Sequence, residues 1–221
     1  MEKALIIGAS GGIGQAVSAA LETRGVTVTG LSRSGDGLDV TDEASVAAAL
    51  GALDGPFDLI LVTTGALEIA GAAPEKALRQ VSAQAMLDQF ALNCMGPSLV
   101  LKHSLRLLPR EGRAVFAALS ARVGSIGDNN FGGWYSYRTA KAALNQMIHT
   151  GAIELGRSHR GAICVALHPG TVETEFTRKY LGRHPAVPAA QAAENLLGVI
   201  ERLRPEESGG FFDWQGATVP W

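Results

Sequence analysis

The sequence predicts an α/β protein built on a doubly wound parallel sheet with helices on both faces. Short apolar runs alternate with amphipathic segments along all 221 residues, and such alternation forms parallel βαβ units with right-handed crossovers. The chain holds 27 glycines, and 47% of its residues are hydrophobic against 18% charged, which suits tight turns and closely packed helices. No linker, repeat or low-complexity tract interrupts the pattern. We therefore expect one domain over residues 1–221.

The first 31 residues set the pattern of strand, glycine turn, helix and strand. Residues 4–7 form an apolar run that is typical of a buried strand. Apolar residues at helical spacing predict a helix over residues 13–24, which Gly25 ends. Residues 26–31 are rich in β-branched side chains and predict the second strand.

The same alternation continues to the end of the chain. A helix is expected over residues 42–50, with Thr41 or Asp42 as its N-cap. Further strands are expected over residues 57–62, 114–119, 162–167 and 210–212, and further helices in two pieces within 74–108, over 135–156 and over 189–203. The buried stripe predicted for the helix over 135–156 comprises Ala140, Ala143, Leu144, Met147, Ile148, Gly151 and Leu155.

Charge and cysteine content argue against several classes of protein. The formal net charge is −2 and no run of Lys or Arg occurs, so a nucleic-acid groove is not expected. Cys94 and Cys164 lie 70 positions apart, which matches no metal-ligand spacing and no disulfide framework, and favours a reduced, cytoplasmic setting. No run of 18 apolar residues and no signal peptide is found, so no membrane segment is expected. The cysteine spacing gives no reason to expect a metal site.

A glycine-rich turn follows the first predicted strand and opens the first predicted helix. It reads Gly8-Ala9-Ser10-Gly11-Gly12-Ile13-Gly14. Glycines allow a backbone to approach a pyrophosphate closely, and a helix N-terminus offers N–H groups and a partial positive charge. The turn therefore predicts a dinucleotide site. The alternative is a glycine-rich connection that binds nothing.

The end of the second strand bears on the choice of dinucleotide. An acidic residue at this place suits the ribose 2′-hydroxyl of NAD(H), whereas a nearby Arg suits the 2′-phosphate of NADP(H). Ser32 occupies the position and Arg33 follows it, which favours NADP(H). Asp36 is the rival that would favour NAD(H). Asp39 and Val40 are expected to line the adenine, although Asp39 also suits a turn.

Tyr137 and Lys141 form the candidate catalytic pair. They lie four positions apart at the start of a predicted helix, so both are on one face. A neighbouring ammonium favours the phenolate and is expected to lower the pKa of Tyr137 toward a range useful in acid–base chemistry. Ser120 stands at the end of a predicted strand, where ligands bind in open α/β sheets. A surface Tyr–Lys contact and a loop cap are the structural alternatives.

Taken together, these residues resemble the short-chain dehydrogenase/reductase family, whose members have a Rossmann fold. The motifs occur in the family's order along nearly the whole chain. The resemblance implies that Asn93 joins Ser120, Tyr137 and Lys141 as a catalytic tetrad. It also implies that the segment His168-Pro169-Gly170-Thr171-Val172 meets the nicotinamide, with Thr174 near its carboxamide or the diphosphate.

The segment from 120 to 137 and the endings Phe212-Asp213-Trp214 and Pro220-Trp221 are similar to the C-factor-like and sniffer-type carbonyl reductases. The resemblance implies that a nicotinamide hydride reduces a carbonyl while Tyr137 donates the proton and Ser120 holds the oxygen. Lys141 would lower the pKa of Tyr137 and bind the nicotinamide ribose, and Asn93 would hold a water that relays protons to Lys141.

Substrate contacts are expected from residues 122–134 and 174–188. Arg122 is open to two interpretations, recognition of an anionic substrate or bracing of its loop. His168 is expected to be a structural histidine rather than a catalytic base, because it directly precedes Pro169 and Gly170 at a strand end.

The sequence departs from the family pattern in several places. Ile7 replaces the usual Thr before the first glycine, and Thr63-Thr64-Gly65-Ala66 stands where Asn-Asn-Ala-Gly is usual. Thr64 and Gly65 are still expected to contact the cofactor. The spacing from Ser120 to Tyr137 is longer than in many members, and the lid segment after Thr174 is short.

Two alternatives to a carbonyl reductase are weighed. The chain could bind NADP(H) without catalysis, as a redox sensor or signalling protein, although binding alone needs no Tyr–Lys pair. A nucleotide-sugar epimerase or dehydratase would need a further C-terminal domain, for which no residues remain. The helices around 84–108 and 135–156 resemble the family's dimer-forming pair, so a homodimer or tetramer is expected.

Overall fold

The computed structural model describes residues 1–175, 177–180 and 185–221. Six strands form one parallel sheet in the order β2-β1-β3-β4-β5-β8. The strands are β1 (Lys3–Ile7), β2 (Thr27–Leu31), β3 (Leu59–Val62), β4 (Glu111–Leu119), β5 (Arg160–His168) and β8 (Phe211–Asp213). The predicted parallel sheet is confirmed.

The sheet order reverses between β1 and β3, because the chain adds β2 on one side of β1 and all later strands on the other. Ligands bind at such a switch point, outside the carboxyl ends of the strands. Ile7 is in register with Val62, and Leu119 with Leu167. The residues that follow these strands therefore share one edge of the sheet.

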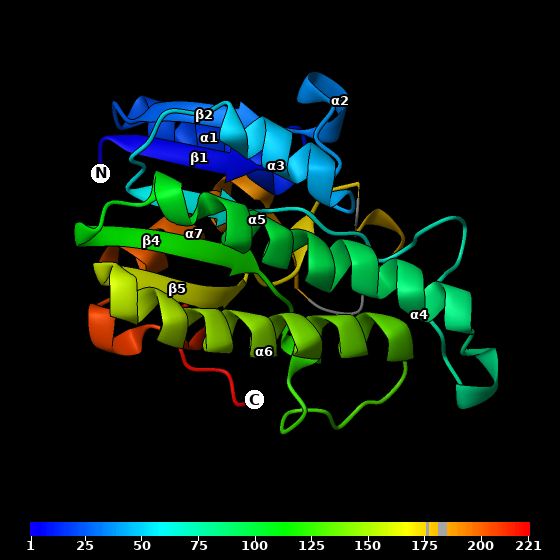
Figure 1. Cartoon of the computed structure of the whole chain (residues 1–221). Coiled ribbons are helices and arrows are strands. Elements are labelled where there is room, and N and C mark those ends of the chain that lie inside the picture. The colour runs from blue at the N-terminus through cyan, green and yellow to red at the C-terminus, as the bar shows by residue number, and fades with distance from the viewer. Residues whose placement is uncertain (176, 181–184) are drawn as a thin grey trace.

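Helices cover both faces of the sheet, as predicted (Figure 1). They are α1 (Gly12–Thr23), α3 (Glu43–Gly51), α4 (Ala83–Phe90), α5 (Gly96–Ser104), α6 (Tyr135–Ser158) and α7 (Ala189–Arg202). One core packs α3, α5 and α6 against residues such as Leu5 and Ile60. The other packs α1 and α7 against the alternate residues Ile6 and Leu61. This alternation follows from the period of two in a strand.

The helical prediction for residues 74–108 is only partly correct. Residues 74–82 contain a 3₁₀ turn, Leu78–Gln80, in place of an α-helix. The side chain of Gln80 accepts from the backbone N–H groups of Lys76 and Ala77, and such local bonds compete with a helix. A π-helical turn, Ala91–Met95, then joins α4 to α5.

Smaller differences concern element ends and short elements. Asp42 rather than Thr41 caps α3, since its carboxylate accepts from the N–H of Ala44 at 3.0 Å. A single helical turn, α2 (Arg33–Asp36), follows β2, and β6 (Val172–Glu173) pairs with β7 (Val187–Pro188). None of these short elements was predicted. Within the described residues, we find no helix long and apolar enough to cross a bilayer.

The buried stripe of α6 differs from the prediction in its polar members. Met147 is 43% exposed, whereas Lys141 and Asn145 are buried. Hydropathy alone assigns polar side chains to the surface, but both of these have hydrogen-bond partners inside the protein.

Candidate active site

The glycine turn has the close contacts that exclude side chains. The N–H groups of Gly8 and Ala9 both donate to the carbonyl of Leu31, at 2.8 and 3.1 Å. A methyl group built on Gly14 would collide with the carbonyl oxygen of Gly8, and one on Gly12 would lie 2.8 Å from the Thr174 Cγ2. The turn therefore needs glycine at both positions, and it brings Thr174 against Gly12.

The N-terminus of α1 suits a phosphate. Its N-cap, Gly11, provides no side-chain cap, and Ser10, Gly11 and Gly12 are exposed while Ile13 is half-buried. Free N–H groups at a helix N-terminus attract anions. The residues present therefore fit a dinucleotide diphosphate.

Thr63 and Thr64, in the segment over 63–66 that departs from the family pattern, have different contacts. The Thr63 hydroxyl lies 3.0 Å from the carbonyl oxygen of Ile7 and 3.1 Å from that of Gly8, so it braces β3 against the glycine turn. The Thr64 Oγ1 is buried and has no hydrogen-bond partner among the described residues. Buried hydroxyls are normally paired, so Thr64 is a fit for a polar group of a bound cofactor.

Arg33 and Asp36, the residues expected to favour NADP(H) and NAD(H) respectively, lie together after β2. The backbone N–H of Ser32 donates to the Asp36 carboxylate at 2.8 Å, and the Ser32 hydroxyl accepts from Gly35 N at 3.0 Å. Arg33 is exposed beside them. The site thus holds an exposed guanidinium and a carboxylate that already binds backbone.

Asp39 and Val40 have structural contacts of their own. Asp39 accepts from the backbone N–H and the hydroxyl of Thr41, at 2.9 and 2.7 Å, and these bonds hold the pKa of its carboxyl below the usual value. Val40 is buried against Gly96, where a methyl group would lie 2.9 Å from the Val40 Cγ2. These bonds of Asp39 stabilise a turn, and its expected contact with the adenine stays a prediction.

The four tetrad candidates are all buried near the carboxyl edge of the sheet. Lys141 donates through Nζ to the carbonyl of Leu119 at 2.9 Å, and Leu119 directly precedes Ser120. The Lys141 Nζ lies 5.8 Å from the ring centroid of Tyr137. Exposed fractions are 0% for Asn93, 4% for Ser120, 7% for Tyr137 and 3% for Lys141.

The expectation that Lys141 lowers the pKa of Tyr137 is wrong for the ligand-free protein. Burial raises the pKa of Tyr137 instead, and it lowers the pKa of Lys141 to about 7, against a smaller opposing effect of Cys94. Burial penalises the charged form of each group, so a Tyr is kept neutral and a Lys loses its proton more readily. At neutral pH, Tyr137 is therefore protonated.

Ser120 has a partner that the sequence did not reveal. Its hydroxyl donates to the Asn145 Oδ1 at 2.6 Å, and Asn145 lies one helical turn after Lys141. A polar residue at that spacing within an apolar stripe was the available signal. Tyr137, Lys141 and Asn145 thus lie along one face of α6.

The side chain of Asn93 is held by contacts within the protein, and the expected water relay stays a prediction. It lies on the π-helical turn, and its amide nitrogen donates to the carbonyl of Ala66 at 2.9 Å and to the Gln89 Oε1 at 2.7 Å. Both amide hydrogens are therefore bound to protein oxygens. Gly65 fits between the two tetrad members, since a methyl group there would lie 2.8 Å from the Asn93 Oδ1 and 3.6 Å from the Lys141 Nζ.

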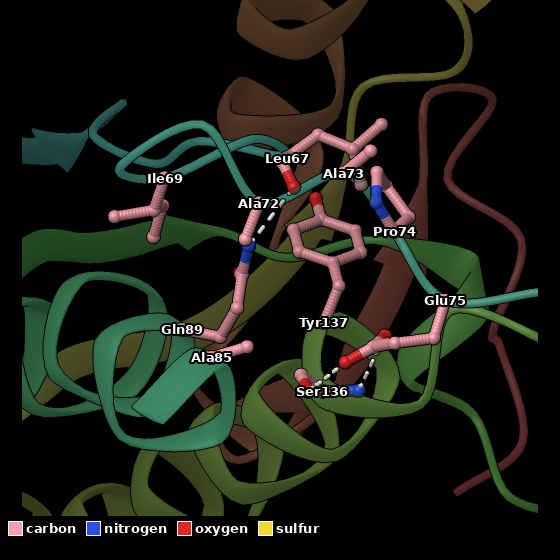
Figure 2. A pocket seen from close by; sticks show the side chains of 10 residues that line it. All are labelled: Leu67, Ile69, Ala72, Ala73, Pro74, Glu75, Ala85, Gln89, Ser136 and Tyr137. Carbon is pink, nitrogen blue, oxygen red and sulfur yellow. Dashed lines mark hydrogen bonds between the residues drawn. The ribbon is translucent and has the colours of Figure 1, made fainter. Parts of the chain in front are cut away.

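A small pocket adjoins Tyr137, and Figure 2 shows the Tyr137 side chain pointing toward Leu67 and Ala73. The pocket volume is about 10 Å³, room for about one water molecule. Its walls are mostly apolar, and they comprise Leu67, Ile69, Ala72, Ala73, Pro74, Glu75, Ala85, Gln89, Ser136 and Tyr137. A larger ligand therefore requires its walls to move.

Trp134 contacts Tyr137, a wall of this pocket, and Tyr180 contacts Trp134. Their rings meet edge to face, with centroids 5.6 Å apart, and Trp134 contacts Tyr137 in the same way at 6.3 Å. The Tyr180 hydroxyl donates to Glu68 at 2.7 Å. Of the segments expected to contact substrate, 176 and 181–184 lie outside the described residues.

Arg122 and His168 both face carboxylates of the protein. Arg122 binds Asp128 through Nε at 2.5 Å and lies 3.8 Å from Asp213, so it braces its loop and is not a free anion receptor. Burial lowers the pKa of His168 to about 4, although Asp213 raises it and Arg122 lowers it further. His168 is therefore neutral at pH 7.

The segment that follows His168 lies at the carboxyl end of β5. A methyl group on Gly170 would lie 3.0 Å from the Trp214 Cδ1, and Val172 is buried in β6. Pro169 and Gly170 are half-buried, and the Thr174 hydroxyl lies 3.3 Å from that of Thr177. Through Thr174, this segment also lies against Gly12 of the glycine turn.

Comparison with known proteins decides the family. Residues 8–210 match the family model described as Enoyl-(Acyl carrier protein) reductase. The chain belongs to the short-chain dehydrogenase/reductase family. It is thus an oxidoreductase of the class that acts on alcohol and carbonyl groups, and the resemblance read from the sequence is confirmed.

Two curated relatives align with most of this chain. The chain is 32% identical to 1-hydroxy-2-glutathionyl-2-methyl-3-butene dehydrogenase of Rhodococcus sp. strain AD45 over 238 residues, which covers 100% of both chains. It is 35% identical to C-signal of Myxococcus xanthus over 167 residues, which covers 76% of this chain and 94% of that protein.

Solved structures share the fold. NADPH-bound carbonyl reductase from chicken fatty liver has a TM-score of 0.86 at 23% identity, covering 100% of this chain and 94% of that one. Carbonyl reductase Sniffer of D. melanogaster has a TM-score of 0.79 at 20% identity, covering 100% of both chains.

Proposed function

We propose that the protein is an NADP(H)-dependent carbonyl reductase in which Tyr137 is the general acid and base. One observation carries the proposal: Lys141 binds the carbonyl of the residue before Ser120, while Tyr137 lies one turn earlier on the same helix. This arrangement gathers a proton donor, a cation and a hydroxyl at the carboxyl edge of the sheet, beside an open glycine turn.

The proposed chemistry divides between the cofactor and the chain. A bound nicotinamide would supply or accept the hydride. Tyr137 is protonated at neutral pH because burial raises its pKa, so it can donate its proton to the substrate oxygen as the carbonyl is reduced. The pKa of Lys141 is about 7, so near neutral pH a large part is cationic and stabilises the phenolate that remains.

We assign the cofactor contacts to residues at the carboxyl edge of the sheet. The diphosphate would be held by Gly8, Ser10, Gly11, Gly12, Ile13 and Gly14, the adenosine by Ser32, Arg33, Asp39 and Val40, and the nicotinamide half by Thr64, Gly65, Tyr137, Lys141, Pro169, Gly170, Val172 and Thr174. Arg33 supports NADP(H) over NAD(H), because it is an exposed guanidinium beside the end of β2.

The experiment that tests the function is NADPH oxidation by the purified protein with aldehydes, ketones, diketones and quinones. The proposal predicts absorbance loss that depends on a carbonyl. Stable binding of NADPH without turnover on any member of the panel would contradict it.

A second candidate is a signalling protein that binds NADP(H) without consuming it. The similarity to C-signal of Myxococcus xanthus at 35% identity supports this alternative. The buried Tyr137 and Lys141 argue against it, because two buried ionisable groups are costly and binding alone does not require them.

We also propose that the protein acts as a homo-oligomer. Apolar side chains are exposed on two neighbouring helices: Met86, Leu87 and Phe90 on α4, and Met147 and Ile153 on α6. Exposed apolar patches mark association surfaces. We expect one functional domain over residues 1–221, in the cytoplasm, where the buried free thiols of Cys94 and Cys164 stay reduced.

A further inference from the structure

We propose that Trp134 is a specificity-determining residue whose indole forms an aromatic wall for the ring of an aryl carbonyl substrate. The inference rests on the proposed function and adds to it the chemical class of the substrate. Three features of Trp134 support it: a strained backbone, contacts with aromatic rings, and an apolar pocket next to those rings.

The backbone of Trp134 is in the left-handed region, with φ 54° and ψ 42°. This region is unfavourable for a bulky L-residue, because the Cβ comes too close to the following carbonyl oxygen. Gly132 and Gly133, which directly precede it, have φ values of 63° and 68°. Glycine thus fills two of three consecutive left-handed positions and would relieve the strain at the third. Residues kept in such strained conformations cluster at functional sites.

The hydrogen bonds of this turn do not depend on the tryptophan side chain. The backbone N–H of Trp134 donates to the carbonyl of Glu75 at 2.5 Å, and its own carbonyl accepts from the N–H of Arg138 at 2.8 Å. Both bonds use backbone atoms that any residue, glycine included, would provide. The turn therefore gives no reason for a tryptophan, and the reason lies in the indole.

The indole contacts two tyrosine rings. Its centroid is 6.3 Å from that of Tyr137 and 5.6 Å from that of Tyr180, and both contacts are edge to face. Tyr137 is the proposed proton donor, whereas Tyr180 belongs to the segment after Thr174 that is expected to contact substrate. Trp134 is half-buried, so part of its ring surface is open. The indole therefore adjoins the reacting group and can accept a ring.

The pocket beside the proposed proton donor suits an apolar group. Its other polar side chains are bound within the protein, since Glu75 and Ser136 bond to each other and Gln89 donates to the carbonyl of Leu67 at 2.9 Å. The rest of the lining is alanine, leucine, isoleucine and proline. Aromatic rings prefer the edge-to-face contacts that Trp134 already makes, so an aryl group is the substituent that this wall favours.

The Tyr180 ring shows the kind of contact that we assign to the substrate. It is held beside the indole while its hydroxyl donates to Glu68 at 2.7 Å. The pocket has room for about one water molecule, so an aryl substrate has to displace this ring or another wall as it binds. Where Tyr180 is displaced, the indole exchanges one ring partner for another.

The test compares Trp134→Ala, Trp134→Gly and Trp134→Phe in NADPH oxidation with benzaldehyde and with acetaldehyde. The two aldehydes share the reacting group and differ in the aryl ring. The readout is kcat/KM for benzaldehyde divided by kcat/KM for acetaldehyde, because a merely structural disturbance lowers both values together. We expect this ratio to fall about three- to thirtyfold in the Ala and Gly variants, and to stay within about threefold of wild type in Trp134→Phe, which keeps a ring.

Melting temperatures test the backbone strain separately. Trp134→Gly should melt about 2–4 °C above Trp134→Ala, because both lack the indole and only glycine relieves the left-handed backbone. Ala70→Gly is the matched control, since Ala70 is exposed and has a φ of 49°. This control should raise the melting temperature by a similar amount and leave the aldehyde ratio unchanged.

Three results would overturn the inference: a wild-type ratio in Trp134→Ala, the same loss of ratio in Ala70→Gly, or a Trp134→Gly variant that melts no higher than Trp134→Ala. Turnover of acetaldehyde but not of benzaldehyde by the wild type would also overturn it, and would leave the proposed function standing. A wild type that oxidises NADPH with no carbonyl of any kind would overturn the proposed function, and the inference with it.

Discussion

The carboxylate of Glu75 binds Ser136, which is 61 positions later in the chain and directly precedes Tyr137. It accepts from the Ser136 backbone N–H at 3.2 Å and from the Ser136 hydroxyl, and both residues are buried (Figure 2). The N-cap residue of α6, Trp134, has a left-handed backbone and provides no side-chain cap. Glu75 therefore caps α6 from a loop that is distant in the sequence.

Replacing Glu75 should weaken both the fold and the turnover. Glu75→Ala leaves two buried donors of Ser136 without a partner, so we expect the free energy of unfolding to fall by about 1–3 kcal/mol in urea titrations. The kcat should fall about tenfold or more, because the start of α6 positions Tyr137. Glu154→Ala, an exposed residue of α6, is the matched control and should change stability by less than about 0.5 kcal/mol. Equal effects of the two substitutions would contradict the capping role.

The close contact inside the glycine turn should make Gly14 essential for cofactor binding. A methyl group on Gly14 would strike the Gly8 carbonyl oxygen, so we expect Gly14→Ala to weaken NADPH binding at least about tenfold in fluorescence titrations. Gly156→Ala lies in α6 with open space around it and should stabilise the protein by about 0.5–1 kcal/mol. Unchanged NADPH affinity in Gly14→Ala would show that the turn does not hold the cofactor.

Cofactor preference should depend on Arg33 and Asp36 in opposite directions. Arg33→Ser removes the cation proposed to bind a 2′-phosphate, so kcat/KM for NADPH should fall about 10- to 100-fold while that for NADH changes little. Asp36→Asn removes the nearby negative charge and should favour NADPH. Steady-state rates of each variant with NADPH and with NADH measure the cofactor preference. Loss of NADH use in Asp36→Asn, with NADPH use intact in Arg33→Ser, would indicate an NAD(H) enzyme.

The buried Lys141 should make the ligand-free protein less stable at neutral than at alkaline pH. Its pKa is about 7 in the folded protein and 10.5 in an unperturbed lysine, so between these values only the unfolded chain binds the proton and stability rises with pH. Each pKa unit corresponds to about 1.4 kcal/mol. We expect Lys141→Met to raise the free energy of unfolding at pH 7 by about 1–4 kcal/mol. The lower value applies if loss of the hydrogen bond from Lys141 to Leu119 offsets much of the gain.

Urea unfolding between pH 7 and pH 10 measures this effect. The advantage of Lys141→Met over the wild type should shrink as the pH rises toward the unfolded pKa. A difference that stays constant over this range would mean that the Lys141 charge is not what costs stability.

The sheet could be predicted from the sequence because each signal was local. The runs at 4–7 and 59–62 are apolar over their whole length, and a strand buried on both faces needs no more than that. Within the mostly helical segment predicted over 74–108, residues 74–82 differ because side-chain bonds of Gln80 favour a tight turn there. The two-residue strands β6 and β7 pair across 15 positions and carry no local pattern.

The site was only partly predictable, for a related reason. Spacing identified Tyr137 and Lys141, and strand ends identified Ser120. Other contacts come from tertiary structure: Glu75 binds Ser136, 61 positions away, and Asn145 binds Ser120, 25 positions away. The predicted shift in the pKa of Tyr137 has the wrong sign. The spacing to Lys141 is visible in the sequence, whereas the burial that raises the pKa of Tyr137 is not.

The most direct test of the account is the turnover of Tyr137→Phe with saturating NADPH and the best carbonyl substrate. Phenylalanine keeps the ring and removes only the hydroxyl, so NADPH should bind as in the wild type while kcat falls about 10²- to 10⁴-fold. Wild-type kcat in this variant, with NADPH bound, would contradict the assignment of Tyr137 as the proton donor.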